Sequence, residues 1–193
     1  MAISLKKGQK VDLTKRHPGL SQVVVGLGWD TNRFDTNGAF DLDTSVFLTG
    51  QNGRVSGSGD FVFYGNLVHP SGSVEHTGDN LTGAGDGDDE QIKVNLQQVP
   101  SHVDKIVFTV TIYESELRNQ NFGMIQNAFI RIYNEQTNEV LLEYDLDEDF
   151  SIETAVVFGE LYRHGGEWKF SAIGSGFNGG LGALCATYGV DVE

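Results

Sequence analysis

Cysteine is almost absent from this sequence, because Cys185 stands alone among 193 residues. One cysteine cannot form a disulfide within the chain, so the fold is not a disulfide framework of the secreted kind. A lone thiol agrees with a reducing compartment. Between Leu184 and Ala186, we expect this side chain to pack as a small apolar group.

Basic residues are also scarce. Lys and Arg together number 13 against 27 Asp and Glu, which gives a net charge of −14. The phosphates of DNA or RNA would repel such a chain, so the composition predicts no nucleic-acid binding. An anionic membrane surface is disfavoured for the same reason, unless bound Ca²⁺ first reverses the local charge.

Long apolar runs are missing as well. No stretch reaches the roughly 18 apolar residues of a membrane-spanning helix, and the lysines of the opening MAISLKKGQKVDL are followed by no apolar run of the kind found in a secretory signal. The sequence therefore predicts a cytoplasmic protein. Its 39% apolar content suffices for one good core, so we expect a single domain over residues 1–193.

Alternating apolar and polar residues predict short strands along most of the chain. The opening residues 3–13 suggest a short strand or a hairpin, and Asn52-Gly53 is a hairpin signal. Gly165-Gly166 is expected to join the last two strands in a final hairpin. GxGxxG at 174–179 lacks the βαβ context of a dinucleotide site, and its glycines are expected to turn the last strand into a short helix. Some ten strands and a terminal helix at 181–188 predict an all-β fold, an antiparallel β-sandwich with a short C-terminal helix. The clearest strands are expected at residues 22–29, 40–48, 61–64, 105–113, 129–133, 139–144, 154–163 and 167–173.

The most unusual stretch is residues 78–90, GDNLTGAGDGDDE, in which glycines and carboxylates dominate. Glycine allows a tightly folded loop, and Ca²⁺ takes about 6 to 8 oxygen ligands. No Lys or Arg lies inside the loop to neutralise it. We therefore predict a hard-cation site, with a solvated acidic loop as the alternative. The candidate ligands are Asp79, Asp86, Asp88, Asp89 and Glu90.

Known calcium-loop templates do not fit this stretch. In an EF-hand alignment that starts at Asp79, Leu81 and Gly83 fall on ligand positions, and the flanks have strand rather than helix character. The calcium β-helix motif must recur, and this loop occurs once. Any cation site here therefore belongs to a loop of a β-protein.

Other carboxylates are expected near the same end of the sandwich. Asp41 and Asp43 share one face of the strand at 40–48, and Asp30 follows the valine-rich strand directly. Because a sandwich gathers its loops at its ends, these groups and the acidic loop are expected to converge. A second acidic cluster, Asp145, Asp147, Glu148 and Asp149, lacks the glycines and is interpreted as a solvated turn.

Several stretches together resemble the TerD family of bacterial tellurium-resistance and general stress proteins. They are GLGWD at 26–30, FDLDTSVFL at 40–48, the acidic loop, RNQNFGMIQNAFIRI at 118–132 and FGELYRHGGEWKFSAIGSGFNGGL at 158–181. The resemblance implies a calcium-binding β-sandwich of the bacterial cytoplasm that holds two Ca²⁺ ions. It also implies that acidic residues of the DLD stretch and of the glycine-rich loop are the ligands.

This sequence departs from the family pattern after the FVFY strand. Two asparagines are usual there, whereas this chain has Gly65 before Asn66. The implied metal ligands are Asp41, Asp43, Asp79, Asp86, Asp88, Asp89 and Glu90, with Asp30, Asp60 and Asn66 as weaker candidates.

The leading functional hypothesis is a non-catalytic Ca²⁺-binding module of a stress or tellurite-resistance system, acting as a calcium-stabilised scaffold or sensor for protein partners. The five histidines are scattered and Cys185 has no catalytic signature around it, so nothing indicates an enzyme. Two alternatives stay open: a Ca²⁺-dependent membrane-surface adaptor, and a metal-dependent hydrolase.

Overall fold

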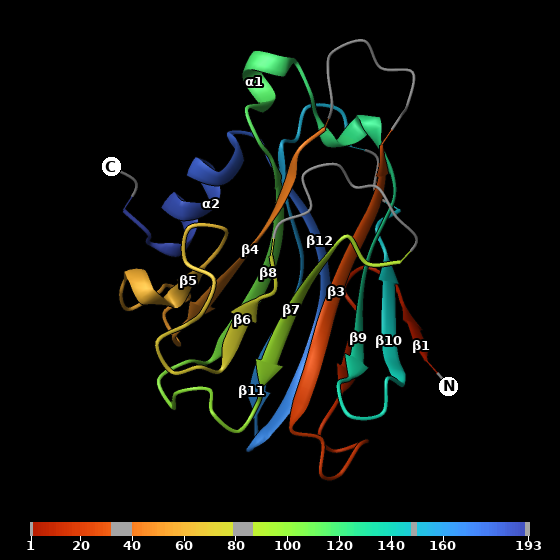
Figure 1. Cartoon of the computed structure of the whole chain (residues 1–193), viewed down its shortest axis with the longest axis vertical. Coiled ribbons are helices and arrows are strands. Elements are labelled where there is room, and N and C mark those ends of the chain that lie inside the picture. The colour runs from red at the N-terminus through yellow and green to blue at the C-terminus, as the bar shows by residue number, and fades with distance from the viewer. Residues whose placement is uncertain (1, 32–39, 79–86, 148–149, 192–193) are drawn as a thin grey trace.

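Two six-stranded sheets pack face to face in the computed structural model, which describes residues 2–31, 40–78, 87–147 and 150–191 (Figure 1). Sheet A has the spatial order β1 (Ile3–Leu5), β10 (Val140–Asp145), β9 (Ile125–Asn134), β3 (Gln22–Thr31), β7 (Glu90–Asn95) and β6 (Val74–His76). Sheet B has the order β2 (Lys10–Asp12), β12 (Glu167–Phe177), β11 (Ala155–His164), β8 (Lys105–Ile112), β4 (Leu42–Thr49) and β5 (Phe61–Val62).

All strand pairs of the two sheets are antiparallel except β1 with β10, which is parallel. The helical elements are α1 (Ser115–Arg118), α2 (Gly180–Tyr188) and the single 3₁₀ turns η1 (Ser58–Asp60) and η2 (Phe122–Met124). None of these helices in the described residues is long and apolar enough to cross a membrane. The predicted β-sandwich with a short C-terminal helix is confirmed.

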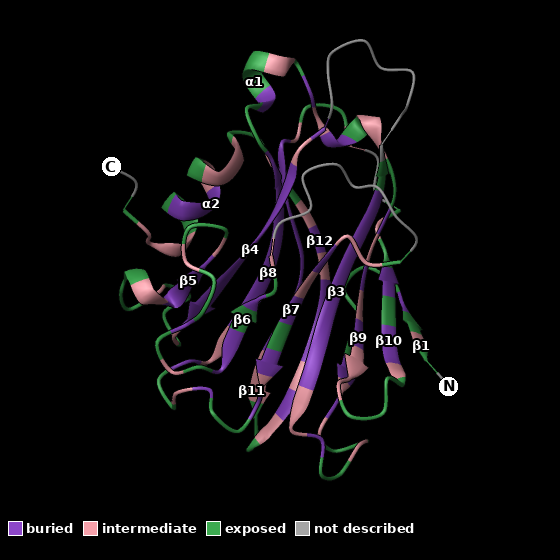
Figure 2. Ribbon diagram, in the orientation of Figure 1, coloured by how far each residue is buried: buried purple, intermediate pink, exposed green. Residues whose placement is uncertain are grey.

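The core lies between the inner faces of the two sheets, where the central strands are buried along most of their length (Figure 2). Val23, Val25 and Leu27 of β3 face inward at alternate positions and are fully buried, as strand periodicity requires. Each such side chain contributes roughly 1.5–3 kcal/mol when removed from water. Inward alternation on β7 continues past Ile92 to Glu90, so a carboxylate stands at the end of the core.

A second, smaller core lies on the outer face of sheet B, beneath α2. Leu184 and Cys185 of the helix pack with Phe47 of β4 and Val157 of β11. Because α2 covers this side of sheet B, β4 is buried on both faces, and even Ser45 is buried. The alternating sequence of β4 is typical of a strand with one solvent-exposed face. Cys185 packs as a small apolar group, as predicted, and burial raises the pKa of its thiol.

Several local predictions were wrong. The opening segment is no hairpin, because β1 joins sheet A and β2 joins sheet B. A turn does form at Asn52-Gly53, but η1 lies between it and β5, which ends at Val62 rather than Tyr64. The helix α1 was not predicted at all. β1 and β2 each pair with a strand of a different sheet, and local propensity does not specify which strand a segment pairs with.

The glycines at 174–179 also behave differently from the prediction that they turn the last strand into the helix. β12 runs on through Gly174 and Gly176 to Phe177. Gly179 alone makes the transition, as the residue that precedes α2, with a φ of 111° that favours glycine. The predicted hairpin across Gly165-Gly166 is confirmed, with both residues at positive φ.

Candidate functional site: an acidic cluster at one end of the sandwich

Asp41 and Asp43 enter the site from the start of β4. Their shared parity places both on the outer face of sheet B, and the carbonyl of Asp41 accepts a hydrogen bond from the Tyr113 N–H at 2.8 Å. One carboxylate oxygen of Asp41, Oδ1, is buried with no hydrogen-bond partner among the described residues. Burial raises the pKa of Asp41; Arg118 lowers it, but Glu90 and Glu114 add to the rise.

Glu90 reaches the same region from the opposite sheet. Its Oε2 accepts a hydrogen bond from the main-chain N–H of Thr44 at 2.7 Å and lies 3.3 Å from Nε2 of His76. Because the Gly78 N–H donates to Nδ1 of His76 at 3.1 Å, Nε2 carries the proton of a neutral ring. Glu90 thus joins the start of β7 to the start of β4 at one end of the core.

Asp89 connects the acidic loop to β3. Its N–H donates to the carbonyl of Leu27 at 2.8 Å, and its Oδ2 accepts from the N–H of Trp29 at 2.8 Å. Burial raises the pKa of Asp89, the Trp29 hydrogen bond lowers it, and the nearby charges of three other carboxylates raise it further. Those three are Asp30, Glu90 and Asp88.

Asp88 is held on the outer face of sheet A by an ion pair. Its Oδ1 lies 2.6 Å from Nε of Arg131, and its Oδ2 accepts from Nε2 of Gln91 at 3.0 Å. The carboxylate occupies the space that a side chain on Gly26 of β3 would fill. Both oxygens of Asp88 are therefore engaged by protein donors.

Arg131 is the functional residue that sequence reasoning missed. It supplies, from β9, the positive charge that the acidic loop lacks within itself. Its guanidinium lies 5.9 Å from the ring centres of both Phe129 and Tyr133, its neighbours on the same face of the strand. The aromatic–Arg–aromatic alternation in FIRIY is the sequence signal that could have identified it, although not its partner.

The predicted convergence of distant carboxylates is present in the described part of the chain. Asp41 is coupled electrostatically to Glu90, and Asp89 to Asp30, Asp88 and Glu90. Asp79 and Asp86, the other two predicted ligands, lie outside the described residues. Within those residues, no group of three or more His, Cys, Asp or Glu side chains is arranged to hold a metal ion.

Asp60 and Asn66, two of the weaker candidates, take part in a separate polar network. Oδ2 of Asp60 accepts from the N–H and the hydroxyl of Ser56, at 3.0 and 2.6 Å, and Oδ1 lies 2.8 Å from Nε2 of His69. Burial raises the pKa of Asp60, but the hydrogen bonds from His69 and Ser56 outweigh it and lower the pKa overall. The Asn66 amide donates to the Phe61 carbonyl at 2.8 Å.

This network includes an Asp–His–Ser chain that is structural in character. The N–H of Ser71 donates to Nδ1 of His69 at 3.1 Å, so Nε2 carries the proton shared with Asp60. The Ser71 hydroxyl lies 2.7 Å from Nδ1 and is also engaged by the hydroxyl and N–H of Ser73, at 2.6 and 3.2 Å. These contacts hold the turn between His69 and Ser73 and tie it to Asp60 of η1.

Asp30, the third weaker candidate, is exposed at the end of β3, where its Oδ2 accepts from the Asn127 amide at 2.8 Å. It borders a cavity of about 430 Å³ together with Asp145 and Asp147 of the second acidic cluster. Both of these side chains are exposed, in agreement with the predicted solvated turn. Glu148 and Asp149 lie outside the described residues.

The TerD domain profile matches residues 1–188. The chain belongs to the TerD family. It is 63% identical over 192 residues to General stress protein 16U of Bacillus subtilis (strain 168), and 54% identical over 193 residues to Tellurium resistance protein TerD of Serratia marcescens. In both cases the alignment covers 100% of each chain.

A solved structure shares the TerD fold. A homologue of telluride resistance protein (TerD) from Streptomyces coelicolor A3(2) superposes with a TM-score of 0.67 at 21% identity, covering 91% of this chain and 100% of that one. The TerD sandwich is therefore retained at low sequence identity. The family membership inferred from GLGWD, FDLDTSVFL and the glycine-rich loop is confirmed.

Proposed function

We propose that this chain is a non-catalytic calcium-binding module of a bacterial stress or tellurium-resistance system, acting in the cytoplasm as a calcium-stabilised scaffold or sensor for protein partners. The family membership and the names of its relatives support the biological setting. The acidic end of the sandwich supports calcium, because desolvated carboxylate oxygens are the hard ligands that Ca²⁺ binds.

One observation carries the calcium proposal. The Oδ1 atom of Asp41 is buried without a hydrogen-bond partner among the described residues, beside a carboxyl group, Glu90, that raises its pKa. A buried, unpaired carboxylate oxygen is costly unless a cation compensates it. The pKa of Asp89 is also raised, by burial and by three neighbouring carboxylates, so a bound cation would stabilise its ionised form as well.

The described residues also rank the candidate ligands. Asp41 is the strongest, because its buried Oδ1 has no hydrogen-bond partner among the described residues. Asp89, Glu90 and Asp88 each accept a hydrogen bond that positions the carboxylate, and Asp43 lies beside Asp41 on the same face. Arg131 supplies one positive charge to Asp88, which leaves Asp41 and Asp89 as the centres of the two proposed Ca²⁺ sites. Asp79 and Asp86 of the loop remain proposed ligands.

Calorimetric titration with CaCl₂ tests this proposal, with and without excess MgCl₂. We expect two binding events that magnesium does not abolish, since Mg²⁺ demands a stricter octahedral shell. Asp41→Asn and Asp89→Asn should each weaken calcium binding at least about tenfold, which corresponds to about 1.4 kcal/mol. Asp12→Asn is the matched control, because Asp12 pairs with Lys169 at 3.2 Å on the edge strand β2.

Thermal unfolding gives an independent readout. Calcium at 100 times its Kd stabilises the folded state by about 2.7 kcal/mol, which corresponds to a rise in Tm of about 5–10 °C for a chain of this size. If Tm stays the same in calcium and in chelator at constant ionic strength, the acidic cluster is a solvated surface and the proposal fails.

A further inference from the structure

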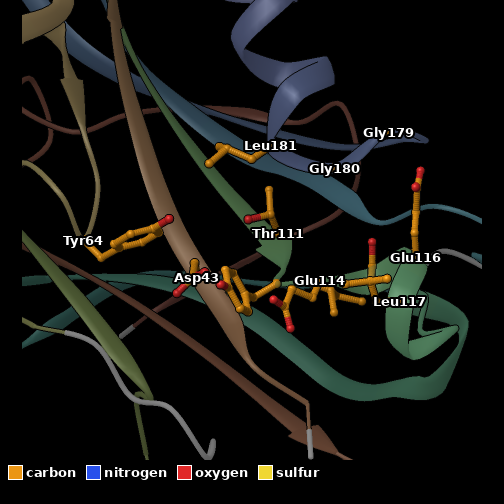
Figure 3. A pocket seen from close by; sticks show the side chains of 12 residues that line it. Asp43, Tyr64, Thr111, Glu114, Glu116, Leu117, Gly179, Gly180 and Leu181 are labelled. Carbon is orange, nitrogen blue, oxygen red and sulfur yellow. The ribbon is translucent and has the colours of Figure 1, made fainter. Parts of the chain in front are cut away.

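A cavity of about 380 Å³ opens on the outer side of sheet B, beside the acidic cluster. Tyr64 borders it on one side and the start of α2, at Gly179–Leu181, on another. Glu114 and Leu117, at and within α1, face Tyr64 across the cavity, with Asp43 between them (Figure 3). A smaller hollow of about 210 Å³ shares Asp43, Tyr64 and Tyr113 with it. We call the two hollows together the Tyr64 pocket.

Exposed apolar side chains gather at this pocket. Tyr64 is 48% exposed, Tyr113 42% and Leu117 81%, and these are three of the six large hydrophobic side chains that are exposed in the described residues. Two of the others, Leu67 and Val68, follow Tyr64 on the same segment. Soluble proteins seldom expose such a cluster unless something binds there.

The charge of the pocket selects the kind of ligand. Its lining contains the carboxylates of Asp41, Asp43, Glu114 and Glu116, and no Lys or Arg is among its described lining residues. Tyr64 and Tyr113 also line the pocket, and the face of a tyrosine ring carries a negative quadrupole to which cations are attracted. The tyrosine rings and the leucine side chains beside these carboxylates give the pocket an apolar surface that an organic cation can contact and a metal ion cannot.

At the rim of the pocket, an arginine of this chain already contacts both a tyrosine ring and a carboxylate. The guanidinium of Arg118 lies 5.7 Å from the ring centre of Tyr113 and 3.3 Å from a carboxylate oxygen of Glu114. An arginine therefore stacks on one of the pocket's rings while it pairs with one of the pocket's carboxylates. A second guanidinium from another molecule would meet the same combination at Tyr64 and Asp43.

We propose that the Tyr64 pocket is a docking site for a basic segment of a protein partner, which inserts an arginine side chain flanked by apolar residues. The guanidinium lies between the tyrosine rings and the carboxylates, and the flanking apolar side chains pack on Leu117 and Leu181. The net charge of −14 favours the approach of such a segment over nucleic acid or an anionic lipid surface. Because Asp43 is also a proposed calcium ligand, calcium and the arginine side chain would compete for it, so the docking proposal concerns the calcium-free protein.

A short peptide titration tests the docking site on the full chain. The ¹⁵N-labelled protein is titrated in EDTA and 150 mM salt with acetyl-Leu-Arg-Leu-amide, and in parallel with the citrulline peptide, which is nearly isosteric but neutral. We expect the arginine peptide to shift the amides of Tyr64, 113–117 and 179–181. The neutral citrulline peptide should bind about tenfold more weakly than the arginine peptide. Equal affinity for the two peptides, or shifts confined to other parts of the chain, would overturn the proposal.

Two pocket variants and one matched control sharpen the test. Tyr64→Leu keeps an apolar side chain but removes the ring, and should weaken the arginine peptide about fivefold. Glu116→Gln removes one carboxylate and should weaken it about twofold. Tyr162→Leu is the control, because Tyr162 lies outside the pocket and carries its own cation, Lys10, at 5.6 Å. Unchanged Tm in all three variants excludes misfolding as the cause.

Other occupants give different results in the same spectra. If the pocket amides shift when the protein alone is concentrated, the occupant is a second copy of this chain. If they shift with single-stranded DNA or with anionic vesicles, the ligand is not a basic protein segment. Each of these results would overturn the proposal, whereas arginine-selective shifts that Tyr64→Leu removes support it.

Discussion

The ion pair between Asp88 and Arg131, on the outer face of sheet A, is expected to contribute strongly to the free energy of unfolding. The Asp88 side chain is 1% exposed, Arg131 is 29% exposed, and Nε and Oδ1 are 2.6 Å apart. Exposed ion pairs contribute at most about 1 kcal/mol, whereas removal of one partner of a buried pair costs about 3–5 kcal/mol. Because only one partner is fully buried here, an intermediate value is expected.

Arg131→Met is the informative change, because it keeps apolar contact with Phe129 and Tyr133 but leaves the Asp88 carboxylate with Gln91 as its side-chain partner. A lost hydrogen bond to a charged group costs about 1.5–3 kcal/mol. We therefore expect a loss of about 2–3 kcal/mol in the free energy of unfolding, or about 5–10 °C in Tm. Asp88→Asn should cost less, about 1–2 kcal/mol, because an amide oxygen still accepts from Arg131.

A double-mutant cycle measures the coupling directly. The wild type, both single variants and the double variant are unfolded with urea in EDTA and followed by the fluorescence of Trp29 and Trp168. Since the double variant leaves no buried charge behind, it should be more stable than the sum of the single losses implies, by about 1.5 kcal/mol. A coupling energy below about 0.5 kcal/mol would show that Arg131 is a solvated surface residue, and would refute the reasoning.

Three further predictions follow from the described contacts. The pKa of Asp60 in the folded protein is lowered from its ordinary value of 3.8. The ionised carboxylate therefore stabilises the fold fully at a pH above 3.8, and this stabilisation is lost as the pH falls through the lower pKa of the folded state. The Tm difference between the wild type and Asp60→Asn should accordingly be largest near pH 6 and should shrink on acidification toward pH 3. A difference that stays constant with pH would contradict the claim that hydrogen bonds to the Asp60 carboxylate lower its pKa. Cys185→Ser should cost about 1–3 kcal/mol in urea unfolding, because it places a hydroxyl in an apolar site, yet in a deletion strain at matched protein level it should retain whatever tellurite protection the wild type gives. Sedimentation with anionic vesicles in calcium should leave the protein in the supernatant, since the net charge of −14 falls only to about −10 with two bound ions, and pelleting that EDTA reverses would favour a membrane adaptor instead.

Local sequence pattern was sufficient for those features that depend on neighbouring residues. The run of valines at 22–29 and the apolar stretch at 105–113 predicted buried strands, and Gly165-Gly166 predicted the hairpin between β11 and β12. Strand propensity and turn geometry depend directly on neighbouring residues. For residues 78–90, composition predicted a need for positive charge, and within the described residues Arg131 supplies such a charge to Asp88; the calcium site remains a prediction.

Tertiary structure alone decided which distant groups meet. β1 and β2 are separated by four residues and enter different sheets, since each pairs with the free edge available to it. Arg131 faces Asp88, and Glu90 faces Thr44, because β9 and β7 flank β3 and the two sheets close over the core. Pairing between strands far apart in the chain is a collective result of packing and has no signature in either segment by itself.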